Sequence, residues 1–253
     1  MAAVAVLCSS ALSVVRASAA EPLTGPPLET QGKPLSPPAP VSATGPRLAG
    51  ISFTTGAALI DLGPINDRLR AAGYPNKLPL AFPIIGGQGF GLFSRFLIGG
   101  SGTGFLSRSV TTPGGEVSAS GAWGTFDFGY QLVRINGLLI APILSLGGYG
   151  MTVDVSSKAD TTFDNALENP TRSTTLTNKG VLGGVSVMAN LIAVGRGAAV
   201  PRARSGWSLG LRLGGLYGVP YRDWQADGVK ATGGPSLGLR GGYAALSLGV
   251  GTW

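Results

Sequence analysis

Apolar and polar residues alternate along several segments of this chain. In Gly206–Val219 the odd positions hold mostly Leu and aromatic residues, whereas the even positions hold mostly Gly, with Ser208 and Arg212. Successive side chains of a β-strand point to opposite faces, so this separation predicts a strand with one apolar face and one small or polar face. Comparable alternation is present over 49–60, 124–133 and 181–194.

The region after residue 48 divides into eight predicted strands. Their expected ranges are 49–60, 84–92, 95–107, 116–133, 138–155, 181–194, 206–219 and 235–253. The pattern leaves open a division into ten strands, because 84–107 and 235–253 can each be divided differently. Asn136-Gly137 lies between two apolar runs and is a strong signal for a two-residue hairpin.

Short and longer connections alternate between the predicted strands. Residues 93–94 and 134–137 are short connections. The connection 195–205 is moderate in length. The longer and mostly more polar ones are 61–83, 108–115, 156–180 and 220–234. In an up-and-down sheet alternate connections lie at the same end, so we expect long loops at one end of the sheet and short turns at the other.

The composition is apolar without an apolar run. The 253 residues have a mean hydropathy of +0.29 with only 12% charged residues and 42 Gly. A membrane-spanning helix needs about 18–20 consecutive apolar residues. Beyond the N-terminus, the longest apolar run is Leu138–Leu144, which Pro142 interrupts. The hydrophobicity is therefore distributed over many strands rather than concentrated in a helix.

The N-terminal region has features of an exported protein. Residues 1–20 are mostly apolar and end in small residues, including Ala17-Ser18-Ala19, which predicts a cleaved signal peptide even though no basic residue precedes the apolar stretch. Residues 21–48 contain 8 of the 18 prolines and are expected to form a disordered Pro-rich tail. Residues 49–253 then form the folded domain.

The even strand number and the sorting of the loops resemble the small outer-membrane β-barrels of Gram-negative bacteria, with OmpA-like and OmpX-like architecture. The resemblance implies an all-β fold, an eight-stranded antiparallel up-and-down transmembrane β-barrel with long outer loops and short periplasmic turns. It also implies a monomer in the lipid bilayer of the cell outer membrane. No nucleic-acid partner is expected.

The last residue, Trp253, resembles the C-terminal aromatic residue through which the outer-membrane assembly machinery recognises such barrels. In that family, apolar residues stand at alternate positions counted back from the aromatic residue. Here those positions hold Gly251, Gly249 and Ser247, so the match requires a bulge near 249–251.

Two groups of side chains are candidate functional features of such a barrel. Polar residues on the small face predict a network in the lumen, where charges must be paired because desolvation is costly. Its expected members are Arg95, Asp127, Gln131, Asn190, Arg212 and Arg240. Aromatic residues near the strand ends predict belts at the two membrane interfaces. Their expected members are Phe96, Tyr149, Trp207, Tyr217 and Trp253.

Other motifs have ordinary structural explanations. The Gly-rich segments 86–91 and 99–104 are followed by no helical pattern, which argues against a nucleotide site. Residues 64–72 predict one short helix, with Pro64 near its start and Gly73 after its end. Asp160, Asp164 and Glu168 match no calcium-loop pattern.

These observations favour a structural or surface-interaction role through the long outer loops. The chain contains no His, so catalysis by Ser-His or Cys-His groups is excluded and we expect neither an enzyme nor a metal or cofactor site. One alternative is a narrow passive pore for small, anionic solutes. Another is a secreted soluble β-barrel that binds a small apolar ligand.

Overall fold

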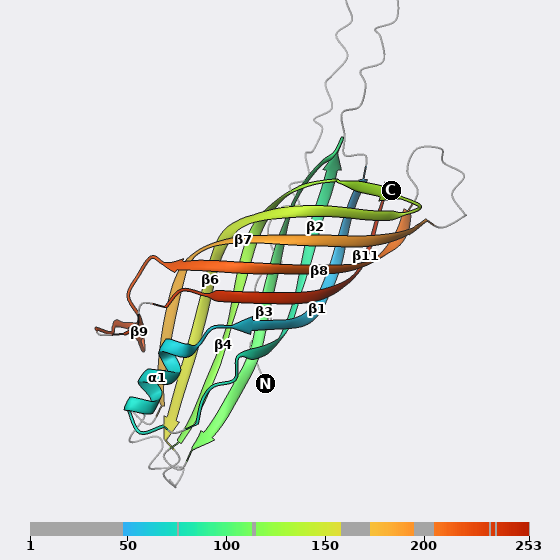
Figure 1. Ribbon diagram of the computed structural model, residues 1–253. Coiled ribbons are helices and arrows are strands. Elements are labelled where there is room, and N and C mark those ends of the chain that lie inside the picture. The colour runs from blue at the N-terminus through green and yellow to red at the C-terminus, as the bar shows by residue number, and fades with distance from the viewer. Residues whose placement is uncertain are drawn as a thin grey trace, which may run out of the picture. The chain divides into compact units, whose positions relative to one another are not determined.

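Eight long antiparallel strands close into a barrel in the computed structural model, which describes residues 48–74, 76–112, 115–157, 173–194, 205–232, 234–235 and 237–252 (Figure 1). The long strands are β1 (Leu48–Ile60), β2 (Ala81–Phe93), β3 (Phe96–Thr112), β4 (Gly115–Tyr130), β6 (Leu138–Ser157), β7 (Ser173–Val194), β8 (Ser205–Pro220) and β11 (Arg240–Thr252). Three short strands, β5 (Val133–Ile135), β9 (Gln225–Ala226) and β10 (Val229–Lys230), extend the sheet. The prediction of an eight-stranded antiparallel barrel is confirmed.

The barrel closes through pairing of its first and last strands. The β1–β11 ladder is regular from Ala49 opposite Thr252 to Ile60 opposite Gly241. The bulge expected near 249–251 is therefore absent from the part of β11 that the structure describes. Trp253, the signal peptide and nearly all of the Pro-rich tail lie outside the described residues. Leu48, expected at the end of the tail, is instead the buried first residue of β1.

The two faces of the strands separate as the alternation predicts. In β8 the side chains of Trp207, Leu209 and Leu213 are exposed on the outside of the barrel, whereas Ser208 and Arg212 are buried inside it. The inner face requires small residues: a Cβ at Gly210 would collide with the side-chain amide of Asn190 on the neighbouring strand. The apolar face is thus the outer face, and the small or polar face lines the lumen.

Several strands are longer than the sequence predicts at the long-loop end. The connection expected at 108–115 is mostly strand, because β3 continues to Thr112 and β4 begins at Gly115. Likewise, β7 begins at Ser173 rather than at 181. These additions pair with their neighbours, as in Val110 opposite Val117, although their Ser and Thr content resembles that of a loop, and the β3–β4 register shifts by one residue between Phe105 and Arg108. As a result, β3, β4, β6 and β7 project beyond the rest of the wall (Figure 1).

The predicted hairpin turn and the predicted short helix are both confirmed by the backbone. Asn136 and Gly137 both have positive φ angles, 49° and 86°, as a type I′ hairpin requires. The expected helix is present as α1 (Gly63–Ala71), and Gly73, with a φ of 89°, follows its end. The described part of the chain contains no helix that is long and apolar enough to cross a membrane.

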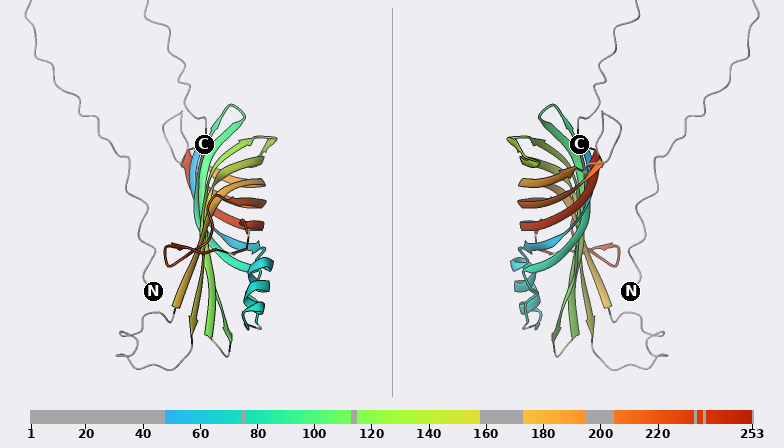
Figure 2. Two further views of the ribbon diagram at one scale, coloured as in Figure 1. Left: turned by 90° about the vertical axis from the view of Figure 1, so that its left-hand side faces the viewer. Right: turned by 90° about the vertical axis from the view of Figure 1, so that its right-hand side faces the viewer.

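The helix α1 lies beside the projecting strands, as the two views of Figure 2 show. The Asn66 side chain holds the segment after the helix: its amide donates to the carbonyl of Leu78 at 3.2 Å and its oxygen accepts from the Leu78 amide at 2.8 Å. Ile65 and Leu62 are buried in the same cluster as Phe82 and Val153. The first long loop therefore packs into the mouth of the barrel.

The lumen contains two separate apolar clusters. The cluster at the short-turn end includes Leu48, Phe90, Leu97, Leu139 and Met188. The larger cluster at the long-loop end combines strand residues with residues from the connecting segments 61–80 and 221–239. Its strand members include Phe105, Trp123, Tyr149 and Met151, and its loop members include Leu62, Ile65, Leu78, Trp224, Leu237 and Leu239. Both ends of the lumen are thus filled by side chains.

Replacing Gly137 should weaken the hairpin at the short-turn end. In Gly137→Ala the added Cβ would lie 2.5 Å from the Ile192 carbonyl oxygen at a positive φ angle, so we expect a loss of about 1–2 kcal/mol in the free energy of unfolding. Urea unfolding of the purified barrel measures this. Gly102→Ala is the matched control, because nothing lies within 4 Å of its added Cβ. An equal effect of the two variants would contradict the assignment of the turn.

Candidate functional site

A polar layer lies in the lumen between the two apolar clusters. At its centre, the Arg212 guanidinium forms two parallel hydrogen bonds with the Asp127 carboxylate, at 2.8 and 3.2 Å. Both side chains are almost completely buried. This bidentate geometry is the strongest form of an arginine–carboxylate pair, and it compensates part of the cost of burying two charges.

Neutral side chains complete the hydrogen bonding of this ion pair. Ser145 donates to Asp127 at 2.6 Å and accepts from Arg212 at 3.0 Å. Ser186 accepts from the Arg212 Nε at 3.0 Å, and the Gln88 side-chain oxygen accepts from Nη1 at 3.4 Å. The Asp127 carboxylate also accepts from the Thr125 hydroxyl at 3.0 Å. The buried charges therefore have several partners besides each other.

The network connects most of the barrel wall. Its hydrogen-bonded members come from β2, β4, β6, β7 and β8, and Ser101 of β3 joins through the Thr125 hydroxyl at 2.8 Å. Tyr243 of β11 adds its ring, whose centre lies 5.9 Å from the Arg212 guanidinium carbon. Seven of the eight long strands thus contribute to one polar layer. A rearrangement of the ion pair would affect side chains all around the lumen.

The space left beside the network is small. A cavity of about 20 Å³ lies next to Arg212, bordered by Thr54, Trp123 and Tyr243, among others. Gln88 also lines this cavity, and its side-chain nitrogen makes no hydrogen bond within the described residues. Such a cavity has room for about one water molecule. At this level the lumen is filled rather than open.

The structure brings together only part of the predicted polar set. Asp127 and Arg212 form the central pair, and Asn190 is buried inside the barrel but donates to the Met188 sulfur rather than to the pair. Arg95 is an exposed residue of the β2–β3 turn, and Gln131 lies beyond the end of β4. The prediction placed Arg95 and Gln131 in the lumen because it continued the alternation past the ends of the strands. Beyond a strand end the alternation of side chains no longer applies.

Arg240 also lies outside the network. It shares the outward parity of β11, and its guanidinium stacks 4.6 Å from the centre of the exposed Tyr217 ring. Sequence reasoning missed Gln88, Ser145, Ser186 and Tyr243. All four have the inward parity of their strands, but only the ladder registers reveal that they lie at the same level as Arg212.

The predicted aromatic positions divide in a similar way. Phe96 and Trp207 are exposed on the outer wall near the short-turn end, and Tyr217 is exposed near the long-loop end. Tyr149, in contrast, is buried in the lumen and its hydroxyl donates to Asn178 at 2.8 Å. Its odd position on β6 places it on the inner face, opposite in parity to the exposed Leu144 and Leu146. The prediction that Tyr149 belongs to the outer belt is therefore wrong.

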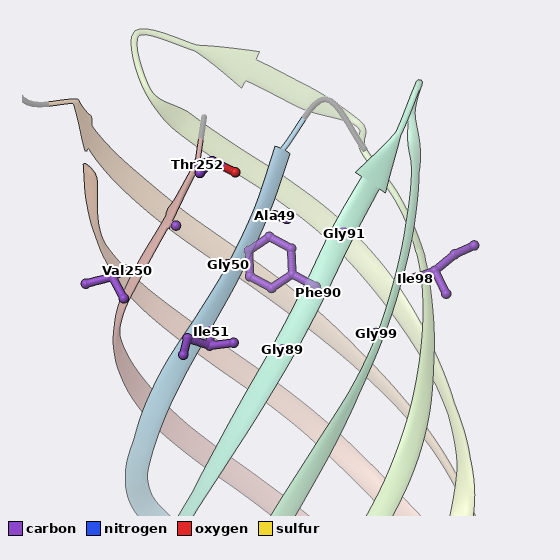
Figure 3. Close-up of a pocket in the computed structure, with 11 residues that line it drawn as sticks. Ala49, Gly50, Ile51, Gly89, Phe90, Gly91, Ile98, Gly99, Val250 and Thr252 are labelled. Atoms are coloured by element: carbon purple, nitrogen blue, oxygen red, sulfur yellow. The ribbon is translucent and has the colours of Figure 1, made fainter. Parts of the chain in front are cut away.

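The outer wall also has shallow depressions where glycines leave out side chains. Figure 3 shows one across β11, β1, β2 and β3, bordered by Ile51, Ile98 and Val250. Its floor contains Gly89 and Gly91, and the Phe90 ring lies behind it. It is an almost entirely apolar surface, continuous with the rest of the exposed wall.

The mouth of the barrel contains a deeper, apolar pocket of about 430 Å³. One face of α1, the inner face of the projecting β6–β7 wall and the segment 224–235 surround it. In that segment the Trp224 indole donates to the Pro235 carbonyl at 2.8 Å. The exposed Lys230 lies 2.6 Å from Asp223, which raises the pKa of the Lys230 amine by hydrogen bonding and charge. Within the described residues, no cluster of three or more potential metal-ligating side chains occurs.

Comparison of the chain with protein-family models and with curated protein sequences gave no match. Evidence for its function therefore comes from the fold and from the arrangement of its side chains.

Breaking the buried ion pair should destabilise the barrel strongly. In Arg212→Met the Asp127 carboxylate would remain buried without its cation, so we expect a loss of about 3–5 kcal/mol in the free energy of unfolding. The double variant Arg212→Met, Asp127→Leu should recover much of this loss, because neither charge remains. Urea unfolding of both single variants and the double variant forms a double-mutant cycle. Additive losses would show that the pair does not act as a unit.

Proposed function

We propose that this chain is an outer-membrane β-barrel protein with a filled lumen, which acts through the segments at its long-loop end. The observation that supports this most directly is the exposed apolar surface around the barrel wall. Large hydrophobic side chains are exposed on all eight long strands, for example Ile51 (69%), Val185 (65%) and Trp207 (63%). Soluble monomers rarely expose contiguous apolar patches above a few hundred Å².

Closure of the sheet is a second feature that is compatible with a lipid environment. Each long strand pairs with a neighbour on both sides, so the barrel wall has no unpaired edge in its central part. In hydrocarbon every backbone polar group requires a partner within the protein, which restricts spanning structures to helices and closed barrels. Outward apolar residues and inward polar residues are the arrangement that this environment favours.

Aromatic side chains near both ends of the barrel also support a position in a membrane. Phe96 and Tyr130 contact each other in an edge-on arrangement at 5.5 Å near the short-turn end, where Trp207 is also exposed. Tyr217 and Tyr221 are exposed near the other end. Aromatic girdles at these two levels would lie at the interfaces of a membrane. Because outer-membrane barrels have short periplasmic turns and longer outer loops, the short turns would face the periplasm and the long-loop end the exterior.

The filled lumen favours a structural or surface-interaction role over a passive pore. An ion pair with its hydrogen-bonding partners occupies the middle of the lumen, and apolar clusters occupy both ends. The buried charges in the lumen also argue against the alternative of a soluble barrel that binds an apolar ligand in its lumen. The segments of the long-loop end, including 61–80 and 221–239, would be the interacting surface.

A charge on the middle of the outer wall should test the membrane assignment. Leu211 is exposed near the centre of β8, and Leu211→Arg would place a cation among lipid chains. We expect a loss of about 2–4 kcal/mol in the stability of the barrel inserted in lipid vesicles, but only about 0–1 kcal/mol for Tyr217→Arg at the rim. Unfolding in urea with vesicles measures both. If Leu211→Arg instead makes the chain more soluble without vesicles and equally stable, the membrane assignment is wrong.

Cysteine labelling of intact cells should report the orientation. In the expected mature chain, which lacks Cys8, Val229→Cys at the long-loop end should react with a membrane-impermeant maleimide. Ile135→Cys at the short-turn end, which is similarly exposed, should react only after the cells are broken. Labelling is measured by mass shift. Reaction of Ile135→Cys in intact cells would contradict the proposed orientation.

A further inference from the structure

The pocket at the mouth is a second feature of the molecule, separate from the polar layer in the lumen. Its floor is the inner face of the projecting wall, with Val153 and Val155 on β6 and Leu176 on β7. Its volume of about 430 Å³ lies within the range of small-molecule sites. It arises from the unequal strand lengths, because only the strands that project beyond the barrel give it a wall.

One face of α1 forms the opposite wall. Ile65, Arg68, Leu69 and Ala72 are spaced by three and four residues, so they share one side of the helix, and all four line the pocket. The third wall consists of Trp224, Ala231 and Pro235. The lining is apolar almost throughout, with a few polar groups at the margin.

Arg68 is the single charged residue of this lining, and its position points to the ligand. The side chain is exposed, and no carboxylate of the described residues lies within ion-pair distance of it. On the same helix, Arg70 is paired with Asp67 at 3.5 Å. An unpaired guanidinium at the margin of an apolar pocket is complementary to a molecule with one apolar end and one anionic end.

We propose that this pocket binds a single-chain anionic amphiphile, such as a long-chain fatty acid. The alkyl chain would occupy the space between α1, the β6–β7 wall and Trp224, and the carboxylate would bind Arg68. The chain would remove apolar surface from water, and the guanidinium would form a charge-assisted hydrogen bond. The proposal does not depend on the membrane assignment, because the pocket belongs to the folded chain itself.

Photolabelling should test this site on the purified, full-length chain held in an amphipathic polymer. The probe is hexadecanoate with a diazirine near the end of its chain, and mass spectrometry locates the labelled peptides. We expect labelling of 61–74, 149–157 and 221–235 that excess hexadecanoate removes. Each methylene removed from the competing fatty acid should lower its affinity about fourfold. Burial of one methylene contributes about the free energy to which this change in affinity corresponds. Hexadecanol should compete at least tenfold less well than hexadecanoate.

Two matched pairs of variants separate this site from unspecific adsorption to the outer wall. Arg68→Gln should reduce labelling at least fivefold, whereas Arg70→Gln should leave it unchanged, because Arg70 does not line the pocket. Ala72→Trp should fill the pocket and abolish labelling, whereas Ala71→Trp, at an exposed neighbour outside the lining, should not. Circular dichroism confirms that each variant folds.

Labelling confined to outer-wall peptides, or equal labelling of Arg68→Gln and Arg70→Gln, would overturn the proposal. If an anionic phospholipid competes better than hexadecanoate, the ligand is a bilayer lipid rather than a free fatty acid. This outcome would also overturn the proposal.

Discussion

Closure of the sheet between β1 and β11 is the constraint on which the rest of this structure depends. Once the ladder closes, every long strand has an inner and an outer face, and the lumen is only as wide as eight strands permit. Small inner residues are a direct result of this limit, as at Gly210, where a side chain would displace Asn190. The outer face meets no such limit and can hold large apolar residues throughout.

The layering of the lumen has the same origin. A narrow, closed interior admits little water, so charged groups within it must satisfy one another. Arg212 and Asp127 do so with two hydrogen bonds, and the side chains of Ser145, Ser186, Gln88 and Thr125 supply further hydrogen bonds to the pair. Apolar clusters on either side shield this layer from solvent. The ion pair and the two clusters therefore act together, since the clusters keep water from the pair and the pair holds the strands at one level.

The unequal lengths of the strands produce a different environment at the long-loop end. There β6 and β7 project past the closed part of the barrel, and their inner faces would be exposed to solvent without a cover. The helix α1 and the segment around Trp224 provide this cover, although the fit leaves a pocket between them. The proposed binding site thus lies where the wall is incomplete, whereas the buried ion pair lies in the closed part of the barrel.

Local sequence patterns were sufficient to predict the strands, although a division into ten stayed open, and to separate an apolar face from a small or polar face. Turn and capping residues likewise predicted the Asn136-Gly137 hairpin and the short helix, because each depends on residues close together in the chain. These patterns were not sufficient for Tyr149, because both faces of β6 are apolar over 138–144, or for Arg240, which has the outward parity of Leu246 and Leu248. The extension of β7 to Ser173 also escaped prediction, since its Ser and Thr residues gain strand structure only by pairing with β6. Tertiary structure alone decided which polar residues lie at the level of Arg212 and where the mouth pocket forms. Both depend on the stagger between strands that are far apart in the sequence, and closure of the barrel determines that stagger.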